Sequence, residues 1–131
     1  MKPLQFSGKR KTAIARATLV EGTGRLSLNN APIETVTPEI LRMKILEPII
    51  IAGDSAKKVD IKVTVHGGGI NGRADAARLA IAKSLAAYNP ALKEEFQRYD
   101  RHLLVADVRH KEAKKPNRHG NARGKVQKSY R

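Results

Sequence analysis

The sequence contains no cysteine and no tryptophan. The lack of cysteine excludes disulfide bonds, thiolate zinc sites and cysteine nucleophiles, and it fits a reducing environment. Aromatic residues make up only 4% of the chain, so alanine and aliphatic side chains must fill the core. No apolar run reaches the roughly 18 residues of a membrane span, and the N-terminus lacks the pattern of a secretory signal peptide. We therefore expect a cytoplasmic protein.

Acidic residues are also scarce, with 12 Asp/Glu against 26 Lys/Arg and a net charge of +14. Residues 109–131 carry nine Lys/Arg and one acidic residue, and Val126 is their only branched aliphatic residue. Such a segment cannot build a core and is disordered as a free chain. Residues 1–108 hold almost all the aliphatic residues, so we predict a globular domain over 1–108 and a basic, extended tail over 109–131.

A terminal block of like charge usually acts as an interaction arm, and its natural partner is a polyanion such as nucleic acid. Fully stretched, the 23 residues of the tail span about 75 Å at roughly 3.3 Å each. The tail can therefore reach far from the globular part. At its end, Tyr130 has a ring that can stack on a base or ribose, and Arg131 has a guanidinium for phosphate.

The first half of the chain reads as strands and one helix. Residues 12–20 are rich in Thr, Ile, Leu and Val, and a Gly-containing turn separates them from 25–28, which predicts a hairpin between these two strands. Thr37 is a suitable N-cap for a helix from about Pro38 toward Glu47, where Pro48 perturbs or ends it. Alternation of Val and Ile with polar residues over 59–65 predicts a half-buried strand.

The second half is mainly helical. Asn71 is placed to cap a helix over about 72–88, Asn89-Pro90 ends it, and a shorter helix is predicted over 91–99. Residues 103–108 are predicted as a brief extended or helical piece before the tail. The order of elements predicts an α+β fold, in which helices cover one face of a small sheet in a two-layer sandwich.

The segment K-R-K-T-A-I-A-R places Lys9, Arg10, Lys11 and Arg16 at and beyond the entrance of a strand. Read as one strand, it puts Arg10 and Arg16 on one face and Lys9 and Lys11 on the other. Cations on a rigid strand can meet successive phosphates, with Arg binding in a bidentate manner. The segment alone is equally compatible with a solvated charge run.

A second basic segment surrounds the glycines at 67–69, which lie between a strand and a helix. The start of a helix presents free N–H groups that favour phosphate, here around Gly68 and Gly69, and Arg73 and Arg78 lie in the first turns. No Gly-Lys-Ser/Thr follows, so it is not a nucleoside triphosphate loop. The alternative is that the glycines only form a tight turn and allow close packing.

An enzyme is not expected. The four histidines show no zinc-protease spacing, and His66, on the same strand face as Asp60, has no nucleophile beside it. We expect no metal, no cofactor and no small-molecule substrate.

Three segments resemble one known family, the ribosomal protein nine family of the small subunit. They are G-K-R-K-T-A-I-A-R near the start, V-H-G-G-G-I-N-G-R-A-D-A-A-R in the middle, and a basic tail ending in S-Y-R. The resemblance spans nearly the whole chain, and the ending is similar to the archaeal and eukaryotic type. The family usually has glutamine after the last glycine of the middle segment, where this chain has Arg73.

The resemblance implies a fold like that of the second domain of ribosomal protein five, with a left-handed β-α-β crossover. It implies a structural component of the small ribosomal subunit whose partners are the rRNA of the head, peptidyl-site tRNA and neighbouring ribosomal proteins. The expected rRNA contacts are Lys9, Arg10, Lys11, Arg16, Gly68, Gly69, Arg73, Arg78, Lys111, Lys114, Lys115, Arg118, Arg123 and Lys125. The expected tRNA contacts are Lys128, Ser129, Tyr130 and Arg131.

Two alternatives stay open at this point. A general nucleic-acid-packaging protein would use the same charges without a specific RNA site. A nucleotide-dependent enzyme would need the glycine turn to hold a small ligand.

Overall fold

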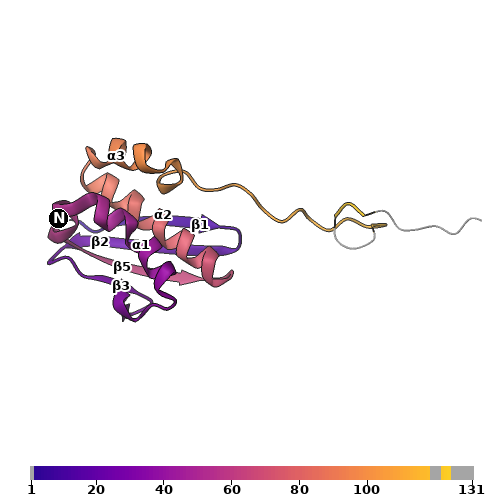
Figure 1. Ribbon diagram of the computed structural model, residues 1–131, viewed down its shortest axis with the longest axis horizontal. Helices are drawn as coiled ribbons and strands as arrows, with labels where there is room; N and C mark the ends of the chain where they lie inside the picture. The colour runs from indigo at the N-terminus through magenta and orange to yellow at the C-terminus, as the bar shows by residue number, and fades with distance from the viewer. Residues whose placement is uncertain (1, 119–121, 125–131) are drawn as a thin grey trace, which may run out of the picture.

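A computed structural model of the chain describes residues 2–118 and 122–124. Its elements form two layers, a five-stranded sheet and a helical layer that covers one face of it (Figure 1). In chain order they are β1 (Leu4–Arg10), β2 (Ala13–Glu21), β3 (Leu26–Leu28), β4 (Ala31–Pro32), α1 (Glu39–Ala52), β5 (Val59–His66), α2 (Ile70–Tyr88) and α3 (Leu92–Tyr99), with short 3₁₀ turns at Ile33–Thr35, Gly53–Lys58 and Arg101–Leu103. The α+β sandwich predicted from the sequence is confirmed.

The strand order is β1-β2-β5-β3-β4. β2 pairs antiparallel with β1 on one side and with β5 on the other. The predicted hairpin between residues 12–20 and 25–28 is therefore wrong, because β3 runs parallel to β5 instead. The hairpin that does form joins β1 to β2 through Lys11 and Thr12, and Lys11 adopts a positive φ of 55° there. A two-residue loop of this kind matches the twist of the two strands.

The connection from β3 through α1 to β5 crosses over the sheet in the unusual hand. In Figure 1, β3 lies below β5, β5 runs from left to right, and α1 lies in front of the sheet. A parallel crossover with this arrangement is left-handed, whereas nearly all such connections are right-handed. The handedness implied by the family resemblance is thus seen in the fold.

Helix α1 extends further than the sequence indicates. It continues through Pro48, which is buried, and ends at Gly53, whose φ of 59° suits glycine. Proline removes one helical hydrogen bond, and burial of the surrounding aliphatic face keeps the helix intact. Thr37 does not cap the helix, because Pro38 takes the N-cap position and no side chain donates or accepts there.

The other elements agree with their predictions to within a few residues. The strand expected over 59–65 is β5, the helix expected over 72–88 is α2, and the helix expected over 91–99 is α3. The region 103–108 contains the end of the last 3₁₀ turn and then irregular chain. Asn71 lies inside α2 instead of capping it, since the helix begins at Ile70.

The core lies between the sheet and the helices, and it contains large side chains such as Ile45, Leu85 and Phe96. Small side chains dominate where α2 meets β1 and the first half of β2. Ala13, Ala15 and Ala17 of β2 are fully buried, and so are several alanines of α2, among them Ala76 and Ala80. Gly8 of β1 lies directly under that helix, since a Cβ on Gly8 would be 2.2 Å from the carbonyl oxygen of Ala76. The absence of side chains at this contact lets α2 rest on the backbone of the sheet.

No helix within the described part of the chain is long and apolar enough to cross a membrane.

Candidate nucleic-acid interface

The β1–β2 hairpin distributes the basic residues of its segment over the two faces of the sheet in a different way from the sequence prediction. Because the chain reverses at Lys11 and Thr12, Lys9 lies across from Ile14 and shares a sheet face with Arg16. Arg10 lies on the opposite face, the one that the helices cover. The predicted grouping of Arg10 with Arg16 is wrong, since it assumed one continuous strand. Lys9, Lys11 and Arg16 are exposed.

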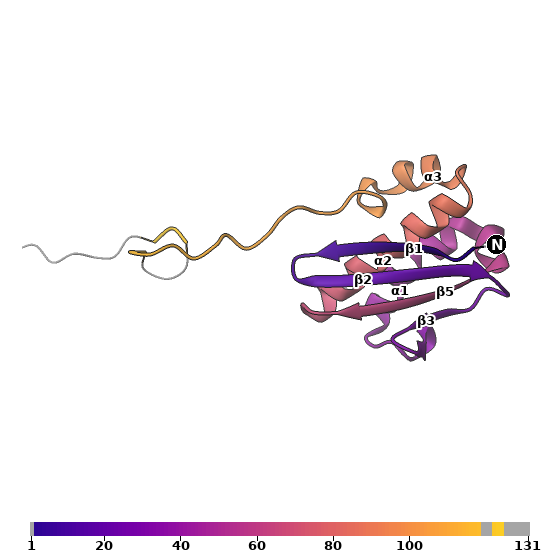
Figure 2. The same ribbon diagram turned by 180° about the vertical axis from the view of Figure 1, so that it is seen from behind.

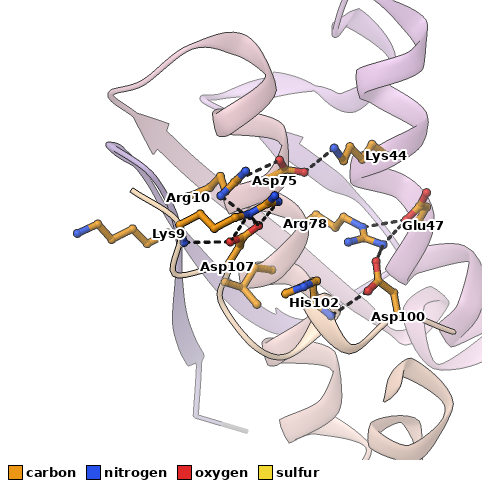
Figure 3. Close-up of a pocket in the computed structure, with 11 residues that line it drawn as sticks. Lys9, Arg10, Lys44, Glu47, Asp75, Arg78, Asp100, His102 and Asp107 are labelled. Atoms are coloured by element: carbon orange, nitrogen blue, oxygen red, sulfur yellow. Dashed lines mark hydrogen bonds and ion pairs between the residues drawn. The ribbon is translucent and has the colours of Figure 1, made fainter. Parts of the chain in front are cut away.

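Arg10 is not free to meet a phosphate. Its side chain is 16% exposed and forms ion pairs with Asp75 of α2 at 3.7 Å and with Asp107 at 3.1 Å (Figure 3). Asp107 belongs to the segment that leaves the globular part, so Arg10 connects β1 to the root of the tail. This is a structural role that the sequence pattern did not indicate.

Arg78 is likewise an internal residue. It is 8% exposed, and its Nε donates to Oε2 of Glu47 at 2.8 Å while Nη2 donates to Oδ2 of Asp100 at 3.1 Å (Figure 3). Glu47 lies on α1 and Asp100 follows α3, so a single guanidinium connects three elements. The structure places Arg78 away from the surface on which the sequence analysis expected it.

These ion pairs lie in one cleft of about 450 Å³ beneath the tail root. Lys44 pairs there with Asp75 at 2.6 Å, next to the pairs of Arg10 and Arg78. Each cation of the cleft that we have named therefore has a carboxylate partner. Five Lys/Arg, Lys9 among them, and four carboxylates line the cleft, so most of its charge cancels locally and it is suited to holding elements together more than to binding an anion.

The glycine turn has a clear packing function. Gly67 and Gly68 have positive φ angles of 78° and 63°, and Cβ atoms on them would approach Thr12 and Ala13 to 2.5 and 2.9 Å. They let the turn lie against the β1–β2 hairpin. Gly69 has open space around its Cα, and Arg73 is exposed with its Nε donating to the carbonyl of Gly67 at 2.9 Å. Arg73 thus remains at the surface, close to the first turn of α2.

The tail root carries a cluster of basic residues beside the hairpin tip. Lys11, Arg109, His110 and Lys111 line a shallow cleft of about 690 Å³ together with Arg10 and Thr12. Asp107 accepts from Nε and Nη2 of Arg109 at 3.0 and 2.7 Å. These hydrogen bonds, with the charge of Arg10, hold the pKa of Asp107 well below its usual range. The carboxylate therefore stays ionised and fixes the direction in which the chain leaves the domain.

Beyond this point the described tail residues extend away from the globular part (Figure 2). The predicted contacts Lys111, Lys114, Lys115, Arg118 and Arg123 are all exposed. Lys115 and Arg123 both pair with Glu112, the single acid of the tail. Lys125, Lys128, Ser129, Tyr130 and Arg131 lie outside the described residues.

Two further residues of the sheet were not predicted as RNA contacts from the sequence. Lys62 and His66 of β5 are exposed on the face that carries Lys9 and Arg16. Their alternation with Val and Ile indicated that they point away from the core. Only the strand order, with β5 next to β2, shows that they join the basic hairpin.

Asp60 provides a test of acid sensitivity. Its Oδ1 accepts from the backbone N–H groups of Thr23, Gly24 and Arg25 at 2.9 to 3.1 Å, and these bonds lower its pKa from the ordinary 3.8. A carboxyl with a lowered pKa in the folded state stabilises the fold above pH 4, and this stability is lost as pH falls through the folded-state pKa. We expect Asp60→Asn to lower Tm at pH 7, and the difference from the wild type to shrink toward pH 2.5.

Thermal melting followed by circular dichroism between pH 7 and 2.5 measures this difference. Asp54→Asn is the matched control, because the Asp54 side chain is 94% exposed and forms one surface ion pair at 3.6 Å. A Tm difference for Asp60→Asn that stays constant with pH would contradict the role given to its carboxylate.

Comparisons with known proteins match almost the full length of the chain. The family model of ribosomal protein S9/S16 matches residues 8–131. The chain is 51% identical to "Small ribosomal subunit protein uS9" of Methanothrix thermoacetophila, with 100% of both chains covered. It is 55% identical to the protein of the same name from Picrophilus torridus, with 95% of this chain and 94% of the relative covered, and 50% identical to that from Desulfurococcus amylolyticus, with 100% and 94% covered. All three organisms are archaea, which agrees with the archaeal and eukaryotic type of the sequence ending. The chain belongs to the ribosomal protein S9/S16 family.

Proposed function

We propose that this chain is a structural component of the small ribosomal subunit in the cytoplasm, bound to head rRNA and to neighbouring ribosomal proteins. In this proposal the tail reaches peptidyl-site tRNA and its last residues contact the anticodon stem-loop. The names of the relatives, at 50–55% identity, support the place in the small subunit. The protein acts by binding and does not catalyse a reaction.

The distribution of paired and unpaired cations is the observation that carries the RNA contact. On the helix-covered side of the sheet, Arg10, Lys44 and Arg78 are neutralised by carboxylates. At the hairpin and the exposed sheet face, Lys9, Lys11 and Arg16 form no ion pair with any described residue. Unpaired cations release counterions from RNA when they bind phosphate, which is the main source of affinity for nucleic acid.

We therefore revise the predicted contact set. Lys9, Lys11, Arg16, Arg73 and the exposed tail cations remain in it, whereas Arg10 and Arg78 are assigned to the internal ion pairs. Gly68 and Gly69 stay predicted contacts through their backbone at the start of α2. The tRNA contacts Lys128, Ser129, Tyr130 and Arg131 stay predictions from the family resemblance.

The energetics favour a tail that takes a fixed path only on RNA. Ordering its backbone costs on the order of 1–2 kcal/mol per residue, which the tail cannot recover from its own apolar contacts. Nine Lys/Arg in 23 residues provide the counterion release that offsets this cost.

Reconstitution tests both parts of the proposal. Small subunits lacking the endogenous protein are rebuilt with the full chain or with a chain lacking residues 129–131. We expect both chains to co-sediment through a high-salt wash, and the truncated chain to retain less tRNA in the peptidyl site by filter binding. Arg98→Gln, which removes one exposed cation from α3, is the matched control and is expected to retain tRNA as the full chain does.

Equal retention of tRNA by the full and truncated chains would refute the tRNA contact. Loss of the full chain in the wash would refute the place in the subunit. The packaging alternative is separated by competition, because a ribosomal component prefers an rRNA head fragment over random duplex DNA at moderate salt, and a packaging protein does not.

A further inference from the structure

The face of the sheet that the helices leave uncovered is broad and polar. Figure 2 views the molecule from this side, with β1, β2, β5 and β3 in front. Alternation along the strands places every second side chain on this face. The outward residues are Gln5, Ser7, Lys9, Ile14, Arg16, Thr18, Val20, Ser27, Asp60, Lys62, Thr64 and His66.

The register of the strands arranges three of the cations in a line. Lys9 lies in the row Lys9–Ile14–His66, Arg16 in the next row between Ser7 and Thr64, and Lys62 in the row after that, beside Thr18. Each step moves one strand sideways, about 4.8 Å, and two residues along, about 6.7 Å. Lys9, Arg16 and Lys62 therefore form a diagonal stripe, with about 8 Å between successive Cα atoms by this geometry.

The cations of the stripe lack acidic partners, in contrast to the cations on the other side of the sheet. Its three residues form no salt bridge with any part of the chain that the structure describes, and the side chains between them are short hydroxyls, a glutamine and aliphatics. Asp60, the one acid on this face, already accepts three backbone N–H groups from the loop between β2 and β3. The field of the stripe is thus positive and little offset by its neighbours.

The stripe also continues toward the tail. Its Lys9 end lies at the hairpin tip, where Lys11 lines a cleft with Arg109, His110 and Lys111. His66, in the row of Lys9, lies at the same end of the face. One connected basic path therefore runs from Lys62 across the sheet and around the hairpin to the tail.

We propose that the diagonal stripe of Lys9, Arg16 and Lys62 binds the phosphates of one RNA strand, which passes across the uncovered sheet face toward the tail root. This inference rests on the proposed function and adds to it the surface and the direction of the RNA. The hydroxyls of Ser7 and Thr64, on either side of Arg16, are placed to donate to the same backbone.

The test removes two charges from the stripe and two from elsewhere. Arg16→Gln/Lys62→Gln is compared with Lys93→Gln/Arg98→Gln, which removes two exposed cations from α3. Binding of the full-length variants to a transcript of the archaeal small-subunit rRNA head is titrated from 0.05 to 0.5 M KCl. We expect the fold to be kept in each variant, because all four side chains are exposed. Thermal melting checks this.

We expect the slope of log K against log salt to be less negative by about 1.5 in the stripe variant. Each of the two lost phosphate contacts contributes roughly 0.7 to 0.9 to the magnitude of this slope. At about 0.1 M salt this corresponds to a loss of affinity of about 30-fold. The control variant is expected to keep the slope of the wild type.

Equal changes of the salt slope in the two variants would overturn the proposed RNA contact of the stripe, because they would show a general charge effect. The proposed function would then still stand. An unchanged slope in the stripe variant with normal RNA affinity would also overturn it and leave this face to a protein partner. A wild-type chain that fails to bind the transcript at 0.15 M KCl would instead overturn the proposed function.

Discussion

Gly8→Val is expected to destabilise the fold by about 3 kcal/mol or more, at the upper end of overpacking effects. The reason is that the new Cβ meets backbone atoms and not a flexible side chain. It would lie 2.2 Å from the carbonyl oxygen of Ala76 and 2.8 Å from the amide nitrogen of Ala80. Helix α2 must move away from the sheet to make room, and its alanines then lose their contacts with β2. In thermal melting this corresponds to a fall in Tm of more than about 12 °C.

Gly69→Val is the matched control for this experiment. Gly69 has a negative φ of −91°, and no heavy atom lies within 4 Å of a Cβ built on it. The same side chain should therefore change the free energy of unfolding by less than about 1 kcal/mol. Similar Tm values for Gly8→Val and the wild type would show that α2 does not rest on β1 as closely as described.

Arg78→Met is expected to destabilise the fold by about 2–3 kcal/mol and to leave RNA affinity unchanged. Removing one partner of a buried ion pair typically costs about 3–5 kcal/mol. Glu47 and Asp100 are 32% and 38% exposed, so water compensates them in part and the expected value is lower. The methionine fills a similar volume, so the loss arises mainly from the two carboxylates that lose their cation.

For Arg73→Gln we expect the reverse of Arg78→Met, namely a change in RNA binding without a loss of stability. Arg73 is exposed and makes one hydrogen bond, to the carbonyl of Gly67. We expect its substitution to change Tm little and to lower the salt slope of RNA binding by about 1. If Arg78→Met weakened RNA binding with an unchanged Tm, Arg78 would have to be at the RNA surface, contrary to its ion pairs.

The local features of this fold could be predicted from the sequence. The alternation over 59–65 and the helical spacing over 72–88 depend on neighbouring residues, and β5 and α2 follow them closely. The partner of β3 could not be predicted in this way. A short strand after a glycine turn favours a hairpin, but here the loop between β2 and β3 is held by Asp60 from β5, and β3 joins the far side of β5.

The same distinction explains the candidate site. The basic segments could be recognised from the sequence, because charge clustering is local. It did not distinguish the cations that are free from those that are paired, since Arg10 depends on Asp107 and Arg78 on Glu47, across 97 and 31 positions. Contacts between residues that are far apart in the chain decide which arginine faces the solvent. Local sequence patterns do not indicate such contacts.

The packing of α2 on β1 has a consequence for synthesis of the chain. At about 5–20 residues per second, the ribosome needs roughly 3–14 s after adding Gly8 to reach Ala76. During that interval the first hairpin has no helix to cover it. Its inner face combines Gly8 and the alanines of β2 with the larger Leu4, Phe6 and Leu19, so this apolar surface stays uncovered in the nascent chain until α2 has been made.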